Sequence, residues 1–234
     1  MDTQLLQVPR GTPKLELDLI ADLACPWSYI AKRSLERALD HLYGAPVRIL
    51  RWHGLPLAGA ERPSWREHLA SRLPRGSSVA AVQSNLKETG SAVGIAFDFD
   101  RLASASVPDT REAHRLVSLA ARDGRQNEVI ESLFSAFFEQ GRDIASPGVL
   151  GEIMQDCQLD AGLHAAFADP TEARSDVSAD EKRMRGLGVV AVPNVLINGR
   201  VLVPGPADVD TYVQALDQAL FPEMPVPVNR SRLH

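Results

Sequence analysis

Residues 21–39 read ADLACPWSYIAKRSLERAL, and this stretch decides the fold. Just before it, Leu15, Leu17 and Leu19 alternate with polar residues, a period of two that predicts a strand. From residue 29 to residue 42 the apolar residues fall on one broad face at helical spacing, which predicts a helix. The segment PVRILRWH, residues 46–53, predicts a second strand. Strand, helix and strand in this order form a βαβ unit.

The next hundred or so residues carry helical signals almost throughout. Asp109 and Glu112 have the spacing of a capping box for a helix that follows. Ser146 and Pro147 have the pattern of an N-cap followed by proline at the first helical position. Between these two starts, a set of apolar residues recurs at helical spacing and is expected to be core: Val129, Leu133, Phe134, Phe137 and Phe138.

In the C-terminal part of the chain, the spacing of apolar residues changes from a helical pattern to a strand pattern. Asp169, Pro170 and Glu172 are expected to start a helix that runs to Gly186 or Gly188. Residues 192–197 and 200–203 predict two short strands, joined by a hairpin turn at 198–199, where the sequence is Asn-Gly. A final helix is expected after residues 205–206, over 207–220.

These signals predict an α/β core interrupted by an all-helical insertion. We place the first part of the core at residues 14–63, the helical insertion at 64–168 and the second part of the core at 169–221. Residues 1–13 and 222–234 are expected to be tails. The first segment contains proline and glycine and the second contains several prolines, residues that interrupt regular secondary structure.

Composition excludes several classes of protein. The 234 residues include only two cysteines, too few for a disulfide-stapled scaffold or a four-cysteine zinc site. The net charge is −5 and no long basic stripe is present, so nucleic acid is not an expected partner. The longest apolar run, at 188–197, is far shorter than the roughly 20 residues of a membrane span, so no membrane association is expected. The N-terminus lacks a secretory pattern, which favours a cytoplasmic protein with reduced thiols.

Cys25 is the first candidate for chemistry. Pro26 at the first helical position makes Cys25 the N-cap, where the sulfur faces unpaired N–H groups and the positive end of the helix dipole. This position is expected to lower the thiol pKa from about 8.5 toward roughly 3.5–7.5. Ser28, one turn along, could donate its hydroxyl to the same sulfur. The alternative is that Cys25 only caps the helix and packs as a small apolar group.

Val192 and Pro193 form the second candidate. A proline at the first residue of a strand can be ordinary punctuation. It can also be a cis-proline whose preceding backbone pairs with an extended, thiol-bearing ligand.

The order βαβ, helical insertion, helix, Val-Pro, ββα, with C-P-W-S at the first helix, resembles the DsbA-like branch of the thioredoxin superfamily, and within it the FrnE-type oxidoreductases. Three segments carry the resemblance, at residues 21–39, 109–120 and 178–205. It implies a thioredoxin-fold core, an active-site cysteine at Cys25 and a cis Pro193 facing it, with Pro26, Trp27 and Val192 among the residues that contact the partner. It also makes a homodimer a reasonable expectation.

The chain departs from the disulfide-forming members of this branch at Ser28, where they carry a second cysteine. A serine hydroxyl cannot attack a mixed disulfide and release the product. Cys157 lies in a predicted amphipathic helix and is expected to be a buried structural thiol. The leading hypothesis is therefore a thiol–disulfide oxidoreductase with one active-site cysteine. Its substrate would be a small thiol or protein disulfide, and an external thiol such as glutathione would act as co-substrate.

Two other hypotheses remain open. Kappa-class glutathione transferases and 2-hydroxychromene-2-carboxylate isomerases are similar in fold and carry an S-P-Y-S-like tetrad at the same place. This implies a glutathione-dependent isomerase or transferase acting on a small organic substrate. Residues 205–207 read Gly-Pro-Ala, however, where those enzymes tend to carry Gly-Ser-Asp for glutathione. The third hypothesis is a non-catalytic binding protein with the thioredoxin fold.

Other polar residues are weaker candidates. Asp22, three residues before Cys25, could accept a proton near the sulfur or could be a solvated turn residue. His53 ends the second strand beside Arg51 and Trp52, near the expected substrate pocket, and could contact substrate or act as a general acid or base; a surface or hydrogen-bonded histidine is the simpler alternative. His114 is expected to be structural. No histidine or cysteine spacing suits a metal, no glycine-rich phosphate loop is present, and no tightly bound cofactor is expected.

Overall fold

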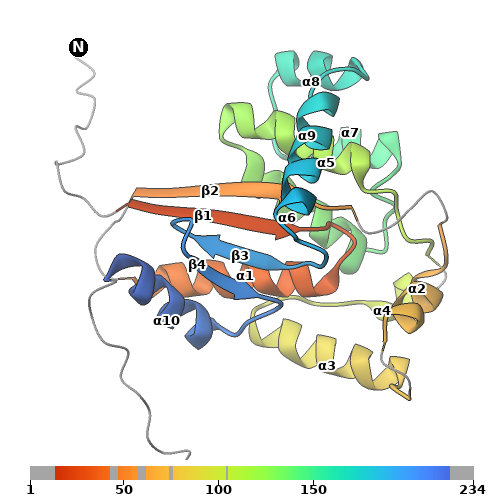
Figure 1. Ribbon diagram of the computed structural model, residues 1–234. Helices are drawn as coiled ribbons and strands as arrows, with labels where there is room; N and C mark the ends of the chain where they lie inside the picture. Colours follow the sequence, from red (N-terminus) through yellow and green to blue (C-terminus); the bar gives the residue numbers. More distant parts are fainter. Residues whose placement is uncertain (1–13, 43–46, 57–61, 74–75, 104, 222–234) are drawn as a thin grey trace, which may run out of the picture.

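A computed structural model of the chain describes residues 14–221 except 43–46, 57–61, 74–75 and 104 (Figure 1). The two predicted tails, 1–13 and 222–234, lie outside the described residues. No helix in the described part of the chain is long and apolar enough to cross a membrane.

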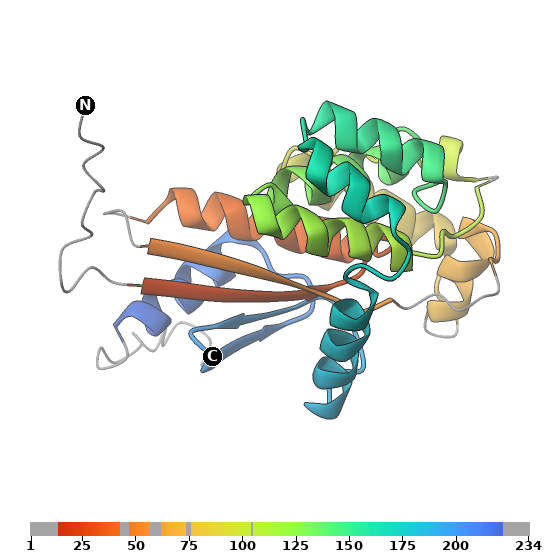
Figure 2. The same cartoon turned by 90° about the horizontal axis from the view of Figure 1, so that it is seen from above.

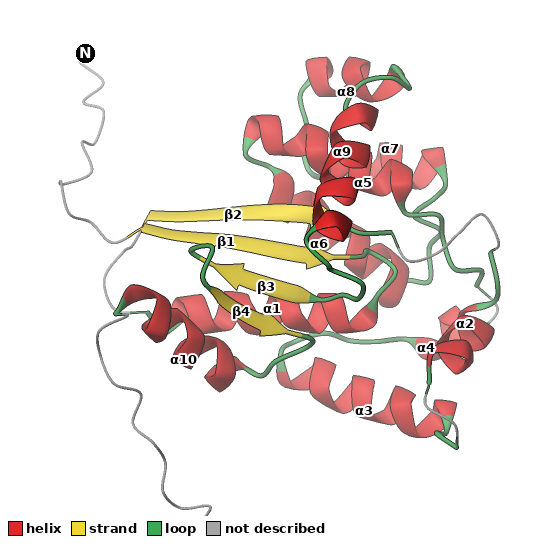
Figure 3. Cartoon of the chain, viewed as in Figure 1, coloured by secondary structure: helices red, strands yellow, loops and turns green. Residues whose placement is uncertain are grey.

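One mixed sheet of four strands forms the centre of the fold, in the order β2-β1-β3-β4. The strands are β1 (Lys14–Ala21), β2 (Val47–Gly54), β3 (Asn194–Ile197) and β4 (Val201–Pro204). β1 pairs parallel with β2 and antiparallel with β3, and β3 pairs antiparallel with β4 (Figure 3). Three helices belong to this part of the chain: α1 (Pro26–Asp40), α9 (Arg174–Gly186) and α10 (Val209–Leu220). The predicted α/β thioredoxin-like fold is confirmed.

The two faces of the sheet are covered differently. Leu15, Leu17 and Leu19 of β1 are almost fully buried. Because side chains alternate along a strand, Asp18 and Ile20 point to the opposite face. Figure 2 shows α9 crossing near the ends of β1 and β2 on the side away from α1. This second face therefore carries polar residues where α9 lies against it.

Among the described residues, seven α-helices and a short 3-10 helix (Ala121–Asp123) follow β2 and precede α9, and we call this part the helical block. The α-helices are α2 (Trp65–Arg72), α3 (Val79–Ala92), α4 (Phe99–Leu102), α5 (Arg111–Ala120), α6 (Gln126–Phe138), α7 (Pro147–Asp156) and α8 (Ala161–Ala168). α7 begins with Ser146 as N-cap and Pro147 at the first position, as predicted.

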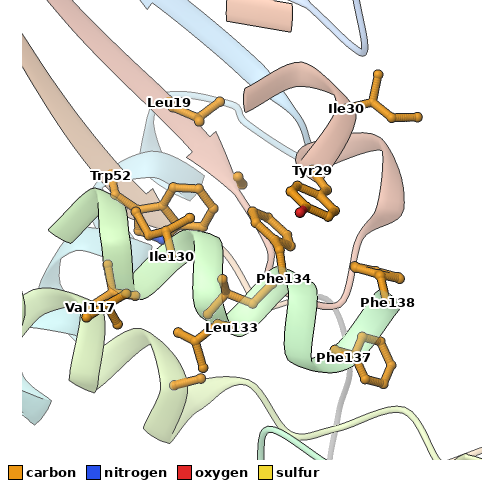
Figure 4. Close-up of a cluster of buried hydrophobic side chains, with 14 of the residues drawn as sticks. Leu19, Tyr29, Ile30, Trp52, Val117, Ile130, Leu133, Phe134, Phe137 and Phe138 are labelled. Carbon is orange, nitrogen blue, oxygen red and sulfur yellow. The ribbon is translucent and has the colours of Figure 1, made fainter. Parts of the chain in front are cut away.

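The sheet, α1 and α6 share one apolar core. Tyr29 of α1 stacks on Phe134 of α6 with ring centroids 4.7 Å apart, and Trp52 of β2 meets the edge of the same ring (Figure 4). The five residues predicted as core between 129 and 138 are all buried. Burying a large apolar side chain is worth about 1.5–3 kcal/mol, so these contacts tie the helical block firmly to the sheet.

The capping box predicted at Asp109 and Glu112 is wrong. α5 begins at Arg111 with Thr110 as its N-cap, and the Thr110 side chain does not cap the helix. Asp109 accepts a hydrogen bond from the Arg111 N–H at 3.1 Å, a local turn rather than a box. The Thr110 hydroxyl instead donates to Asp22, 88 residues earlier. A distant partner has therefore replaced the local one.

The helix expected from Asp169 starts later, at Arg174. The Asp169 carboxylate accepts hydrogen bonds from the N–H and hydroxyl of Thr171 at 2.9 and 2.7 Å, which holds a turn there. Ala173 then has φ 57°, a left-handed conformation that separates this turn from α9.

The hairpin turn between β3 and β4 is confirmed. Asn198 and Gly199 both have positive φ, 51° and 65°, as the two-residue turn that matches the twist of a hairpin requires. The last helix begins two residues later than predicted, at Val209, because Asp208 caps it by accepting the Thr211 N–H at 2.8 Å.

Candidate active site

Cys25 is the N-cap of α1, as predicted. Its backbone is extended, with φ −100° and ψ 113°, and Pro26 occupies the first helical position. The Cys25 carbonyl accepts the N–H of Ser28 at 3.0 Å, which closes the first turn. Cys25 and Trp27 are partly exposed, whereas Pro26 and Ser28 are buried. The helix start therefore presents the cysteine toward the surface on a fixed backbone.

Ser28 is fully buried beneath Cys25. Its hydroxyl oxygen accepts the N–H of Asp22 at 3.4 Å, and hydrogen bonding from Ser28 lowers the pKa of the Cys25 thiol. Ser28 therefore acts on the pKa of the thiol in the predicted direction. Ser28 also joins the cysteine to the turn that precedes it.

The pKa of the Cys25 thiol is nevertheless raised, so the expected lowering is wrong. Loss of hydration is the largest cause, and the Asp22 charge adds to it. Hydrogen bonds from Ser28 and from the Trp27 backbone act in the opposite direction without reversing the shift. Part of Cys25 reaches the surface, but the surrounding protein displaces enough water to raise the pKa of the thiol. The shift favours the protonated thiol of Cys25 in the free protein.

Asp22 is buried, not a solvated turn residue. Its Oδ1 accepts hydrogen bonds from the Thr110 hydroxyl at 2.8 Å, from His114 Nε2 at 3.3 Å and from the Ala24 N–H at 3.4 Å. Its carbonyl accepts the N–H of Cys25 at 3.0 Å. A buried carboxylate thus lies in the same turn as the cysteine, held partly by residues of α5.

His114 is buried, as expected for a structural residue, and it also contacts Asp22. Trp52 Nε1 donates to His114 Nδ1 at 3.1 Å. Since an indole N–H can only donate, Nδ1 must be the acceptor and Nε2 carries the proton that points at Asp22. Gly54 lies against the ring: a Cβ there would be 2.5 Å from Nδ1. The sequence pointed to Asp22 and His114 separately but not to Thr110 or to the contact of both with Asp22, because no local pattern joins residues about 90 positions apart.

His53 lies in a cluster of charged side chains on the other face of the sheet. Its Nε2 is 2.8 Å from Asp18 Oδ1, and its Nδ1 is 2.9 Å from Asp180 Oδ2 on α9. Burial alone would lower the pKa of His53, but the hydrogen bonds to Asp180 and Asp18 reverse this and raise it. Arg51 pairs with Asp18 at 2.7 Å and Arg183 with Asp180 at 2.8 Å.

Two cavities adjoin His53. One, of about 510 Å³, lies between β2 and the helical block and is also lined by Trp52 and His114. The other, of about 650 Å³, is lined by residues 187–191 of the loop before Pro193. Cys25 lines neither of these two cavities. The contact between His53 and substrate stays a prediction.

The Val192–Pro193 peptide bond is cis. The register pairs Ile20 with Asn194, which sets Pro193 beside the end of β1, where the chain turns toward Cys25. Val192 packs with a small apolar group that includes Ile20 and Leu55. The Pro193 carbonyl accepts the Gly205 N–H at 2.8 Å. The loop is therefore anchored to β1 on one side and to the end of β4 on the other.

Cys157 is buried and lies at the end of α7, as predicted for a structural thiol. Its sulfur is 3.4 Å from the Ser132 hydroxyl. Both cysteines are free. Within the described ranges, no group of three or more histidine, cysteine or acidic side chains has the arrangement of a metal site.

Comparison with known proteins agrees with this geometry. A family model described as a DSBA-like thioredoxin domain matches residues 16–217. A search of curated proteins gave no significant match. Among solved structures, a probable DsbA oxidoreductase from Streptomyces coelicolor is 25% identical with a TM-score of 0.78, over 92% of this chain and 93% of that chain.

Two further structures share the fold at lower identity. The cytosolic disulfide reductase DsbM from Pseudomonas aeruginosa, solved with GSH, is 23% identical with a TM-score of 0.61, over 89% of this chain and 97% of that one. A 2-hydroxychromene-2-carboxylate isomerase is 14% identical with a TM-score of 0.65, over 88% and 97%. At these identities the likeness concerns the fold alone.

Proposed function

This chain belongs to the DSBA-like thioredoxin domain family, and from that premise we propose that it exchanges thiols and disulfides through one active-site cysteine, Cys25. The observation that carries the proposal is the first turn of α1. There Cys25 is the partly exposed N-cap, and the residue three positions later is the buried Ser28 rather than a second cysteine.

In the first step, Cys25 attacks a disulfide R–S–S–R′. A bond forms between Cys25 Sγ and one substrate sulfur, the substrate S–S bond breaks, and the leaving sulfur takes the electron pair and a proton as R′–SH. The thiolate is the attacking species. Because the pKa of Cys25 is raised, the rate of this step should increase with pH across the neutral range.

In the second step, an external thiol resolves the mixed disulfide. Ser28 cannot attack it, and Cys157 lies buried in the helical block. The external thiol bonds to the substrate sulfur, and Cys25 leaves and regains its proton. When the substrate is a glutathione mixed disulfide R–S–S–G and the external thiol is glutathione, the net reaction converts R–S–S–G and one reduced glutathione into R–SH and oxidised glutathione.

Neighbouring residues take supporting roles in this proposal. Ser28 donates to the Cys25 sulfur and favours its thiolate, which partly offsets the effect of burial. Pro26 and Trp27 form the surface beside the sulfur, and the backbone of Val192 and Pro193 orients the extended partner. Such a reaction suits a cytoplasmic protein, where thiols are kept reduced. DsbM, which shares this fold, is described as a cytosolic disulfide reductase and was solved with GSH.

Exchange activity with a glutathione mixed disulfide, measured with excess reduced glutathione, tests the proposal. Cys25→Ser should lose all activity above background, because serine cannot form the mixed disulfide. Cys157→Ala is the matched control and should retain activity. Ser28→Cys should create an internal disulfide and remove the dependence on the external thiol in the resolving step. Full activity of Cys25→Ser in this assay would contradict the proposal.

A second candidate is a glutathione-dependent isomerase or transferase for a small organic substrate. The raised pKa of Cys25 favours it in one respect, since a protonated Cys25 could hold the thiolate of a bound glutathione by hydrogen bonding. Cys25→Ser recreates an S-P-x-S tetrad, so turnover of such a substrate would survive this substitution. Loss of that turnover in Cys25→Ser would exclude the candidate.

A further inference from the structure

Asp22 is a buried acidic residue in the same turn as the candidate thiol. It is 1% exposed, its carbonyl accepts the Cys25 N–H, and its N–H donates to the Ser28 hydroxyl oxygen at 3.4 Å. Its charge opposes ionisation of the Cys25 sulfur. Two carboxylate or thiolate charges close together in a water-poor site repel strongly. Whatever holds the Asp22 carboxylate in place therefore also affects how readily the Cys25 sulfur ionises.

Two of the groups that hold the Asp22 carboxylate come from α5 of the helical block. Thr110, the N-cap of α5, donates its hydroxyl to Oδ1 rather than to its own helix. His114, one turn further along α5, donates from Nε2. A helix N-terminus also favours a nearby negative charge. Both donors are buried, so water cannot readily replace them.

The direction of the His114 hydrogen bond is fixed by a third residue. Trp52 on β2 donates to Nδ1, so the neutral ring has its proton on Nε2, the nitrogen that faces Asp22. The ring also packs against Gly54, where no side chain competes for the space. His114 therefore donates a hydrogen bond to Asp22, and both the tautomer and the position of its ring are fixed.

His68 on α2 is another titratable group that senses Asp22. Burial and Arg72 lower the pKa of His68, while the charge of Asp22 acts against them. His68 is therefore neutral near pH 7 and changes charge only in acid. Its titration lies well below that of the Cys25 thiol, so the two can be separated in a pH series.

We propose that His114 and Thr110 are positioning residues for Cys25: they hold the Asp22 carboxylate in the turn that precedes the sulfur, where its charge disfavours the reactive thiolate. The inference rests on the proposed function only in taking Cys25 as the reacting thiol. The helical block thus contributes, through a carboxylate, to the reactivity of Cys25, in addition to the loss of hydration that is the larger influence.

The pH dependence of Cys25 alkylation by iodoacetamide tests this inference, in a Cys157→Ala background and with no disulfide or glutathione present. Asp22→Asn removes the charge and should lower the midpoint, giving about tenfold faster alkylation at pH 7 for a shift of about one unit. His114→Leu removes a donor, so the buried carboxylate takes up a proton, and the midpoint should move in the same direction by a smaller amount. His114→Gln, whose amide nitrogen can reach the place of Nε2, should stay near the parent.

A double substitution separates positioning from a general structural effect. In an Asp22→Asn background, His114→Leu should cause no further shift, because it acts only through the Asp22 charge. Thr110→Val and Thr110→Ser form a second pair of variants. The alkylation midpoint should shift in Thr110→Val and stay unchanged in Thr110→Ser. This pair replaces the histidine variants in the test if His114→Leu does not fold.

Three results would overturn the inference: an unchanged midpoint in the folded donor-deleted variants, equal shifts in His114→Leu and His114→Gln, or a His114→Leu shift that persists without the Asp22 charge. Alkylation of Cys25 requires no thiol–disulfide exchange. A failure of this inference can therefore be distinguished from a failure of the proposed function.

Discussion

Two histidines lie against carboxylates in this protein, and they are held in opposite ways. His114 has one carboxylate, Asp22, on Nε2, and an indole N–H from Trp52 on Nδ1. His53 has a carboxylate on each nitrogen, Asp18 on Nε2 and Asp180 on Nδ1. Both rings are buried. The difference is the partner on the second nitrogen: the indole N–H fixes the tautomer of His114, whereas the second carboxylate helps to raise the pKa of His53.

The two arrangements serve different parts of the fold. The His114 cluster joins α5 to the turn before Cys25, where a fixed donor can hold one carboxylate beside a thiol. The His53 cluster joins β1 and β2 to α9, the helix that leads into the Val192–Pro193 loop. The two carboxylates raise the pKa of His53, so protonation of the ring strengthens the contacts that join the strands to α9.

Filling the space beside His114 should strongly destabilise the protein. Gly54→Ala places a Cβ against the ring, and the displaced ring loses its place between Trp52 and Asp22. We expect a loss of about 1–3 kcal/mol in the free energy of unfolding, measured by denaturant titration.

Gly151 in α7 is the matched control for this change, since a Cβ there meets nothing within 4 Å. Gly151→Ala should leave stability unchanged or raise it by up to about 1 kcal/mol. Equal stabilities for the two alanine variants would show that the His114 ring is not confined as described.

Removing the Trp52 donor should release the tautomer of His114. Trp52→Phe leaves Nδ1 of His114 without its indole partner, so the proton of the neutral ring is no longer confined to Nε2. The unpaired buried nitrogen should cost about 1–3 kcal/mol. Histidine ring NMR should show one fixed Nε2–H tautomer in the parent and a mixture of tautomers in the variant. A mixture of tautomers in the parent would contradict the assignment.

The smallest expected effect is on the pH dependence of stability. The pKa of His53 is raised in the folded protein, so its cluster contributes fully below the ordinary value of about 6.5 and loses its contribution as pH rises through the folded value. Stability should therefore fall on going from pH 6 toward pH 8.

This series is best measured with Cys25→Ser, because the raised pKa of Cys25 adds a loss of stability at higher pH. Asp180→Asn removes one partner of His53 and should flatten the pH dependence. An unchanged slope in Asp180→Asn would mean that another group is responsible.

The sequence predicted the features that depend on neighbouring residues. Cys25 followed by Pro26 identified the helix start, and Asn198 with Gly199 identified the hairpin turn, because backbone geometry alone demands those residue types. Apolar spacing at 129–138 correctly placed the core face of α6.

The acidity of Cys25 could not be predicted in this way. The pKa of the Cys25 thiol depends first on its loss of hydration in the fold, and then on neighbouring groups that include Asp22. The partners of Asp22 lie 88 and 92 residues away, at Thr110 and His114. Likewise, Asp180 meets His53 across 127 residues. A prediction from the helix N-terminus considers only the local dipole. The pKa of the Cys25 thiol depends also on nearby charges and on the loss of hydration on folding.

Mass spectrometry after incubation with oxidised glutathione tests the central claim most directly. We predict one glutathione adduct, on the peptide that contains Cys25, forming faster as the pH rises and released by reduced glutathione. Cys25→Ser should carry none, and Cys157→Ala should behave like the parent. A protein without an adduct at Cys25, or one whose adduct persists in excess reduced glutathione, would contradict exchange through a single cysteine.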